Sequence, residues 1–177
     1  KLLSHRQSPG ALAALDQERW WPCGKMDVQG EELSVADIAQ APGDPTQIVR
    51  VTAGPHEVAV QLGASMIEGW VVVRRLRVVA EGKGDSVEGR LLAFEVPVDS
   101  AAVVVCDRQP LMRALRPGDR EAALADLETR APRPSVVALA RRVEVLVIPS
   151  GDGDGSYPVY ALQAAGRTVG IEVDFTT

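Results

Sequence analysis

The sequence predicts an α+β domain that is mainly β: an antiparallel β-sandwich or a half-open barrel, with two or three short helices inserted between about residues 107 and 142. The chain is 46% hydrophobic but only 4% aromatic, so aliphatic residues must fill the core, and β-branched valine favours strands. Alternating apolar and polar runs recur at short spacing, roughly eight in all. Helix-like segments gather in one region, ahead of the last strands.

The chain length fits one domain. With 177 residues it can bury a sizeable core without disulfide bonds. Residues 1–16 are expected to form an N-terminal arm or short helix, because the helix-like residues 11–15 follow a Ser-Pro-Gly break. Residues 17–177 are expected to form a single β-rich domain. Trp20 and Trp21 would anchor the arm to it, the alternative being an exposed aromatic platform for a ligand.

The first half of the domain is expected to contain strands, turns and one helix. Residues 25–28 predict a short strand, and residues 31–40 predict a short helix. Residues 47–51 and 57–62 alternate on either side of a turn at Gly54-Pro55. We therefore expect these two segments to form an antiparallel pair.

Residues 70–80 predict a longer strand with an irregularity. Arg75 and Arg77 share the parity of two upstream valines, which indicates a β-bulge or a strand that is covered on both faces. We expect the arginines of this strand to form a solvated face rather than an anion site. The Gly-rich residues 81–89 then predict a polar hairpin loop.

The second half combines strands with the helical region. Residues 90–98 predict a strand, and the uninterrupted apolar run 101–106 predicts a buried central one. Asp107, Asp119 and Ser135 each stand where a helix N-cap is expected. These three positions are the starts of the predicted short helices.

Residues 150–175 are the most distinctive stretch of the chain. A Gly/Asp loop leads into an alternating run, a turn at Ala165-Gly166 follows, and a second alternating run closes the chain. This pattern predicts a β-hairpin behind an acidic loop.

Asp152 and Asp154 in that loop form the first candidate site. Glycines flank both residues, and a D-x-D-G run resembles the start of calcium loops, so a divalent cation such as calcium is the cofactor it would bind. The remaining ligands of an EF-hand are missing from the sequence. The structural alternative is that the glycines adopt positive φ in a turn while the aspartates cap neighbouring amides, with no cofactor.

Asp99 and Asp107 form the second candidate site, because they bracket the apolar run 101–106. If that run lies near the hairpin, either carboxylate could join Asp152 and Asp154 at one rim, to bind a metal or share acid–base work. The structural alternative is that Asp107 caps a helix and Asp99 begins a strand.

Other catalytic patterns are missing from the sequence. The two histidines, His5 and His56, lie in the arm and beside a turn proline, and His56 is expected to face solvent. The sequence contains no G-x-S-x-G, P-loop or H-E-x-x-H motif. We therefore expect a protein that is not an enzyme.

The charge pattern limits the classes of partner. The formal net charge is −5, and the basic residues are scattered, so nucleic acid is not an expected partner. No apolar run reaches the roughly 18 residues of a spanning helix, so we expect no membrane association and a soluble, cytoplasmic protein. Cys23 and Cys106 are far apart in sequence and are expected to be free thiols in a reducing compartment, the alternative being one disulfide.

Several segments carry a family resemblance. They are Gly54-x-His56-x-Val58, Val98-Asp99-Ser100-Ala101, Gly153-Asp154-Gly155-Ser156-Tyr157-Pro158-Val159 and Val173-Asp174-Phe175. Over about residues 22–175 the chain resembles a bacterial family of uncharacterised domains, domains of unknown function that end in a G-D-G-x-Y-P-V hairpin and carry a V-D-x-G stretch upstream. Here Ser100 or Ala101 replaces that glycine. The resemblance implies a fold and an order of elements, and no activity.

The resemblance also implies a role for Tyr157-Pro158. Proline has no amide to donate, so the strand should start there or lie at a sheet edge, with the tyrosine ring closing over the acidic loop. Tyr157 thereby joins the four aspartates as a candidate contact for a ligand or partner.

Two hypotheses of function remain open. The first is a non-enzymatic binding or interaction domain of a bacterial protein, of the immunity or accessory type, whose partner is another protein. The second is a metal-dependent hydrolase or metal-regulated sensor that uses the clustered aspartates.

Overall fold

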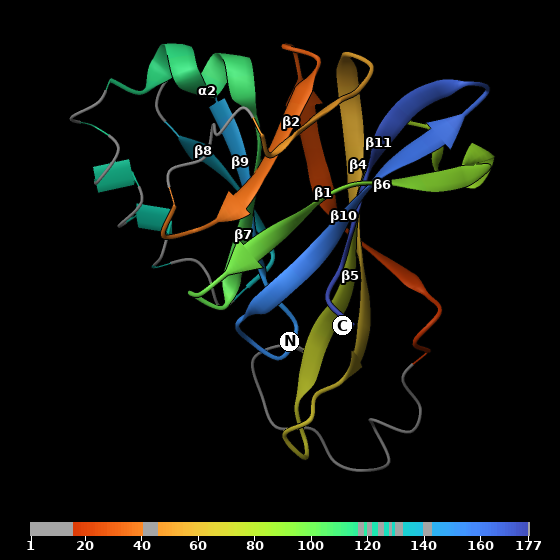
Figure 1. The fold of residues 1–177 in the computed structure, drawn as a ribbon, viewed down its shortest axis with the longest axis vertical. Coiled ribbons are helices and arrows are strands. Elements are labelled where there is room, and N and C mark those ends of the chain that lie inside the picture. The colour runs from red at the N-terminus through yellow and green to blue at the C-terminus, as the bar shows by residue number, and fades with distance from the viewer. Residues whose placement is uncertain are drawn as a thin grey trace.

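The computed structural model describes residues 16–40, 46–116, 119, 122–123, 126–127, 129, 133–139 and 143–176. The predicted N-terminal arm lies almost entirely outside these residues. Within them the protein is mainly β, with two antiparallel sheets and the short helix α2 (Arg108–Ala114) at one end (Figure 1). The coarse prediction of a mainly β chain with antiparallel strands is therefore confirmed.

One sheet has six strands. In spatial order they are β1 (Trp20–Val28), β4 (Gly54–Ala64), β5 (Val71–Ala80), β11 (Arg167–Asp174), β10 (Gly155–Ala164) and β6 (Gly89–Val98). The C-terminal hairpin β10–β11 occupies interior positions and joins the N-terminal strands of this sheet to β6. The predicted β5 bulge is present, because its register with β4 shifts between Gln61 and Leu62.

The other sheet has five strands. In spatial order they are β3 (Ile48–Arg50), β2 (Glu32–Asp37), β7 (Ala102–Asp107), β9 (Val143–Pro149) and β8 (Ser135–Leu139). All six residues of β7 are buried, which confirms the predicted central strand. Its wholly apolar run is explained by cover on both faces.

Two apolar clusters provide that cover. The larger one joins the sheets, with Leu76 and Ile171 from the six-stranded sheet meeting Leu33 and Ile148 from the five-stranded one. The second lies on the opposite face of the five-stranded sheet, where Leu111 of α2 packs with valines of β7 and β9. Burial of this aliphatic surface is the main favourable term in folding.

The terminal hairpin follows the sequence prediction. Ala165 and Gly166 have φ values of +48° and +72°, so both turn residues are left-handed, as a type I′ hairpin turn requires. Pro158 lies inside β10 rather than at its start, and β10 is not an edge strand. At Pro158 the strand pairs only with β6, because pairing with β11 begins at Val159. Pro158 therefore lies at a point where β10 has a paired strand on one side only, which is where a residue without an amide hydrogen is tolerated.

Several predicted elements are wrong. The helix expected at residues 31–40 is largely strand β2, whose residues from Leu33 to Asp37 are all buried. Residues 47–51 and 57–62 do not pair, because β3 pairs with β2 while β4 pairs with β1 and β5. In both cases sheet pairing decided the outcome over local sequence preference.

Within the predicted helical region the structure gives bounds for one helix, α2, and the described residues 122–123 and 126–127 are also helical. Ser135 begins strand β8 rather than a helix, because residues 135–139 pair with β9. The segment predicted to follow Asp119 falls largely outside the described residues. Among the described residues, no helix is long and apolar enough to cross a bilayer.

The two cysteines are free thiols. Cys106 is fully buried in β7, and this burial raises its pKa to about 12, so the thiol stays protonated and unreactive at neutral pH.

Candidate functional site

The acidic loop connects β9 to β10 and is folded on itself. The Ser150 hydroxyl donates to the Gly153 carbonyl at 2.7 Å, and Gly151 has a φ of +58°, which explains one of the glycines. The Tyr157 hydroxyl also donates to the Gly153 carbonyl, at 2.7 Å, and the ring lies edge-on to Phe175 at 5.1 Å between centroids. The tyrosine ring therefore closes over the loop as predicted.

Asp152 uses both carboxylate oxygens to hold a neighbouring loop, residues 65–70, which joins β4 to β5. Its Oδ1 accepts hydrogen bonds from the Met66 amide at 3.0 Å and from the Ser65 hydroxyl. Its Oδ2 lies 3.0 Å from Nη1 of Arg74, and the Asp152 side chain is only 13% exposed. Asp152 thus braces the β4–β5 loop: its carboxylate holds that loop against the acidic loop through hydrogen bonds.

The other three predicted carboxylates have different surroundings. Asp154 and Asp99 are exposed. Asp107 is buried at the N-cap position of α2 but makes no side-chain cap bond. Its Oδ2 instead accepts from the backbone amides of Gln29 and Gly30, the latter at 2.7 Å, so this carboxylate ties the β1–β2 turn to β7.

The four aspartates are not brought into one metal-binding group. Over the part of the chain that the structure describes, no group of three or more His, Cys, Asp or Glu side chains is arranged to hold a metal ion. Asp152 also has a guanidinium as its nearest counter-charge. Metal binding by Asp152 and Asp154 stays a prediction.

His56 is buried, contrary to the expectation that it faces solvent. It lies in β4, with Nδ1 2.9 Å from the Gly54 carbonyl oxygen. Burial lowers its pKa below the usual value, which favours a neutral imidazole at neutral pH.

The loop that Asp152 braces exposes three large apolar side chains. Met66 is 84% exposed, Ile67 68% and Trp70 42%. We call residues 65–70 the apolar tip. Its backbone is closed by bonds from the Ser65 amide to the Trp70 carbonyl at 2.9 Å and from the Trp70 amide to the Ile67 carbonyl at 3.2 Å. The Ile67 amide also donates to the Ser65 hydroxyl, at 3.0 Å. The tip is therefore an ordered apolar protrusion.

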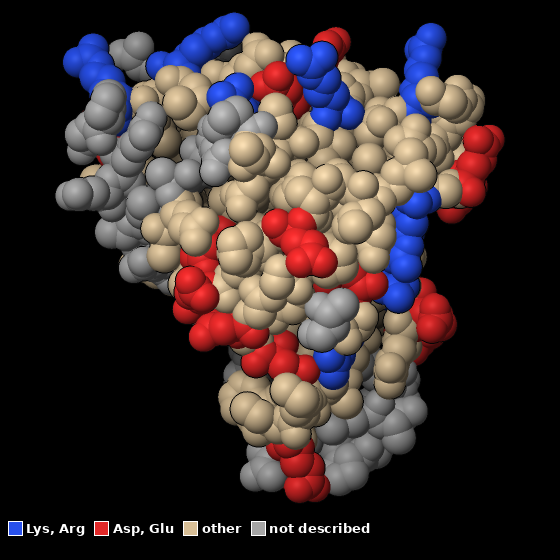
Figure 2. Space-filling model, in the orientation of Figure 1, with Lys and Arg blue, Asp and Glu red and all other residues tan. Residues whose placement is uncertain are grey.

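The apolar tip lies at one end of the molecule, opposite α2, where the β4–β5 connection projects beyond both sheets (Figure 1). On the face drawn in Figure 2, acidic side chains gather over the half nearer this end, while most basic side chains lie along the opposite margin. Glu68 adds a carboxylate within the tip itself. On this face of the molecule, acidic side chains therefore predominate near the tip.

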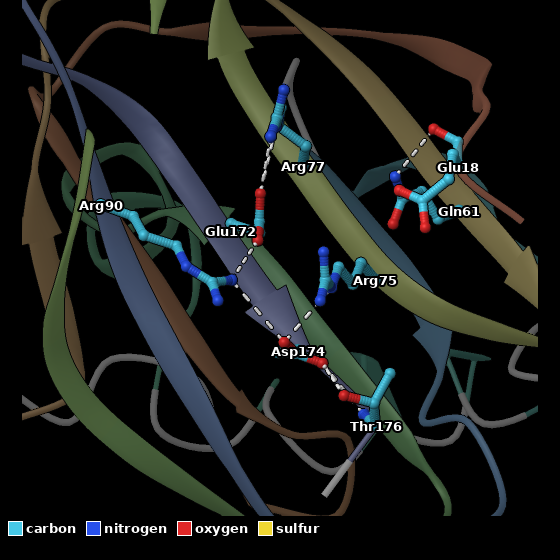
Figure 3. Close-up of polar contacts among 8 residues, drawn as sticks. All are labelled: Glu18, Gln61, Arg75, Arg77, Arg90, Glu172, Asp174 and Thr176. Carbon is cyan, nitrogen blue, oxygen red and sulfur yellow. Dashed lines mark hydrogen bonds and ion pairs between the residues drawn. The ribbon is translucent and has the colours of Figure 1, made fainter. Parts of the chain in front are cut away.

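A second polar cluster, which sequence reasoning missed, covers the outer face of the six-stranded sheet (Figure 3). Arg77 of β5 and Arg90 of β6 both bind Glu172 of β11, at 2.8 and 2.7 Å. Arg75 lies 3.2 Å from Asp174. The expected solvated arginine face is therefore an ion-pair network, because β11 aligns each carboxylate opposite an arginine of β5.

Aromatic rings complete this network. The Arg77 guanidinium lies 4.1 Å from the Trp20 ring centroid, and Arg90 lies 4.4 Å from that of Tyr160. The Glu172 side chain is only 3% exposed, so its charge is nearly removed from water. In the sequence, the alternation Glu172-Val173-Asp174 indicates two carboxylates on one face of a strand, but it does not indicate that β11 pairs with β5.

We expect a strong energetic coupling between Arg77 and Glu172. A double-mutant cycle with Arg77→Met and Glu172→Gln should give a coupling energy of about 1–3 kcal/mol in urea unfolding, since the pair is largely desolvated. The exposed pair Lys25–Glu81 serves as the control and should couple much more weakly. Equal coupling in the two pairs would contradict a special contribution of the network.

Comparison of the chain with models of protein families, with curated proteins and with solved structures finds no match in any of the three. The resemblance to uncharacterised bacterial domains stays a prediction. The class that fold and site define is a mainly β domain of two antiparallel sheets, with a braced apolar tip at one end.

Proposed function

We propose that this chain is a non-enzymatic protein-binding domain that contacts its partner through the apolar tip. The carrying observation is the exposure of Met66, Ile67 and Trp70 on a loop held by Asp152. Grouped exposed apolar side chains mark interaction surfaces. A loop that is already ordered loses less conformational entropy on binding, which favours affinity.

The chemistry of the tip suggests the chemistry of its partner. Trp and Met are enriched in the buried centres of interfaces, where a partner pocket removes them from water. Glu68 within the tip adds negative charge beside the apolar residues. The partner surface is therefore an apolar pocket with basic residues at its rim.

An immunity or accessory role in a soluble, cytoplasmic bacterial protein accords with this proposal, because an acidic protein of net charge −5 attracts a basic partner electrostatically. The metal-dependent alternative has less support, because Asp152 is already engaged by Ser65, Met66 and Arg74. The shared apolar cluster between the two sheets supports a sandwich as the scaffold.

The partner can be trapped at the tip. A photo-crosslinking amino acid at position 67 should link the chain to one recurrent protein in the cells that produce it, whereas the same group at Met112 should not. Met112 is a suitable control because it is exposed and apolar and lies on α2. The trapped protein is then purified, and its affinity for the untagged chain is measured by calorimetry.

Ile67→Asp should weaken that affinity at least tenfold, which corresponds to about 1.4 kcal/mol, while Met112→Asp leaves it unchanged. Asp152→Ala should weaken it as well, by releasing the loop. Unchanged affinity in Ile67→Asp would refute the proposal. So would binding of the tip to phosphatidylcholine vesicles in place of any protein, since a membrane would then be its target.

A further inference from the structure

Among the described residues, strand β6 has no strand neighbour on the side away from β10. It is the last strand of the six-stranded sheet, with β10 as its neighbour on one side. Residues 89–93 are all exposed, and Leu91 and Leu92 are 62% and 60% exposed. Edge strands are usually protected by charged side chains, bulges, proline or a short length; β6 has Arg90, Glu95 and one bulge, but it has ten residues and no lysine or proline before Pro97. An apolar edge of this kind favours pairing with another strand.

A bulge divides this edge at Ala93. Phe94 lies opposite Val159 and Leu92 opposite Tyr160, so Ala93 is an extra residue in β6. Arg90 and Glu95 lie opposite Leu162 and Pro158, respectively. Since these two β10 residues are four apart, they share a face, and Arg90 and Glu95 therefore share the outer face of the sheet. Without the bulge, residues five apart would point to opposite faces.

The segment 90–95, R-L-L-A-F-E, is self-complementary when read antiparallel. Aligned about a two-fold axis between Leu92 and Ala93, it places Arg90 opposite Glu95 of the second copy and Leu91 opposite Phe94 of the second copy. Because of the bulge at Ala93, the two residues of each pair lie on the same face of the sheet: Arg90 with Glu95, and Leu91 with Phe94. Opposite charges and apolar pairs placed directly across strands stabilise antiparallel pairing.

We propose that β6 pairs antiparallel with β6 of a second copy of this chain, joining the two six-stranded sheets into one continuous sheet. The interface is isologous, meaning that both copies use the same strand, as in most soluble homodimers. Arg90 contributes although it already binds Glu172, because its guanidinium has five donors and its side chain is 42% exposed. A single strand pair buries less than about 1,200 Å², so the dimer is weak and dissociates on dilution.

Sedimentation velocity over roughly 10–500 µM protein tests the pairing, since weak dimers of this kind populate only toward the upper end. The wild type should shift from monomer to dimer. Leu92→Lys, which places a charge on the edge, should weaken the dimer at least tenfold, whereas Met112→Lys should not. Both residues are exposed, so thermal melting should show both variants folded. A wild type that stays monomeric throughout, or a dimer unaffected by Leu92→Lys, overturns the proposal.

Disulfide trapping tests the register. In a Cys23→Ser background, Leu91→Cys and Phe94→Cys chains are prepared separately and mixed under mild oxidation. The proposed register expects a covalent dimer in the mixture and little in either chain alone. Efficient crosslinking of Leu91→Cys to itself would show another register, and failure of all combinations would show that β6 edges do not meet.

Discussion

Gly170→Ala is expected to lower the free energy of unfolding by about 3 kcal/mol or more. A methyl group on Gly170 would lie 2.1 Å from the carbonyl oxygen of Val78 and 2.7 Å from the Cα of Val79. Both contacts are with the backbone of β5, which pairs with β11 at this point. Relief would require the two strands to separate, so the clash cannot be removed by a side-chain rotation.

Urea unfolding followed by circular dichroism measures this loss. Gly89→Ala is the matched control, because Gly89 also lies in a strand of the same sheet and a methyl group there meets nothing within 4 Å. Gly89→Ala should be neutral or stabilise the protein by up to about 1 kcal/mol, by restricting the unfolded chain. Similar stability changes in the two variants would show that β11 and β5 can move apart at little cost.

Asp37→Ala is expected to cost about 3 kcal/mol or more. Asp37 ends β2 and is fully buried. Its carboxylate accepts from the amides of Ala39, Asp99 and Ser100, at 2.6, 2.5 and 3.0 Å, and from the Ser100 hydroxyl. Removing it leaves these donors without their protein partner in a partly buried site.

The stability contributed by Asp37 should depend on pH. Burial by itself would raise the pKa of this carboxyl, but the hydrogen bonds from Ser100, Asp99 and Ala39 together lower it below the usual value. A lowered folded-state pKa means that the carboxylate stabilises the fold above the unfolded pKa of about 3.9 and loses that contribution as the pH falls through the folded pKa.

Unfolding in guanidinium chloride at a series of pH values measures how much stability Asp37 contributes and how that contribution depends on pH. The stability difference between wild type and Asp37→Asn should be largest near neutrality and should shrink below about pH 4. Asp99→Asn is the control, since that exposed carboxylate should change stability by less than about 0.5 kcal/mol. A pH-independent difference would show that the charge on Asp37 contributes nothing.

Local sequence chemistry predicted the elements that depend on neighbouring residues. The Ala165-Gly166 turn, the alternating strands on either side of it and the apolar run of β7 follow from turn geometry and from the two-residue period of a strand. The placement of Tyr157 over the acidic loop was implied by the family resemblance, and the hydrogen bond from its hydroxyl to the Gly153 carbonyl agrees with it. The misassigned helix at residues 31–40 shows the limit of such reasoning, because β2 is held by pairing with β3 and β7.

Strand pairing also decides the surroundings of the predicted site. The sequence offered two interpretations of Asp152 and Asp154, cation binding or capping of neighbouring amides, and in the structure Asp152 accepts from the Met66 amide of the β4–β5 loop. Asp37 was not predicted at all, because its donors lie some sixty residues away in sequence, at Asp99 and Ser100. The arginines of β5 meet their carboxylates only because β11 is the neighbouring strand.

The sequence by itself determined a mainly β chain, its terminal hairpin, its buried central strand and its acidic loop, because periodicity and turn chemistry act over a few residues. Apart from this hairpin, only the tertiary structure decided which strands are neighbours. That choice depends on which apolar faces can be buried together across long stretches of chain. It placed the carboxylate of Asp152 against an exposed apolar tip, and among the described strands it gave β6 a neighbour on one side only.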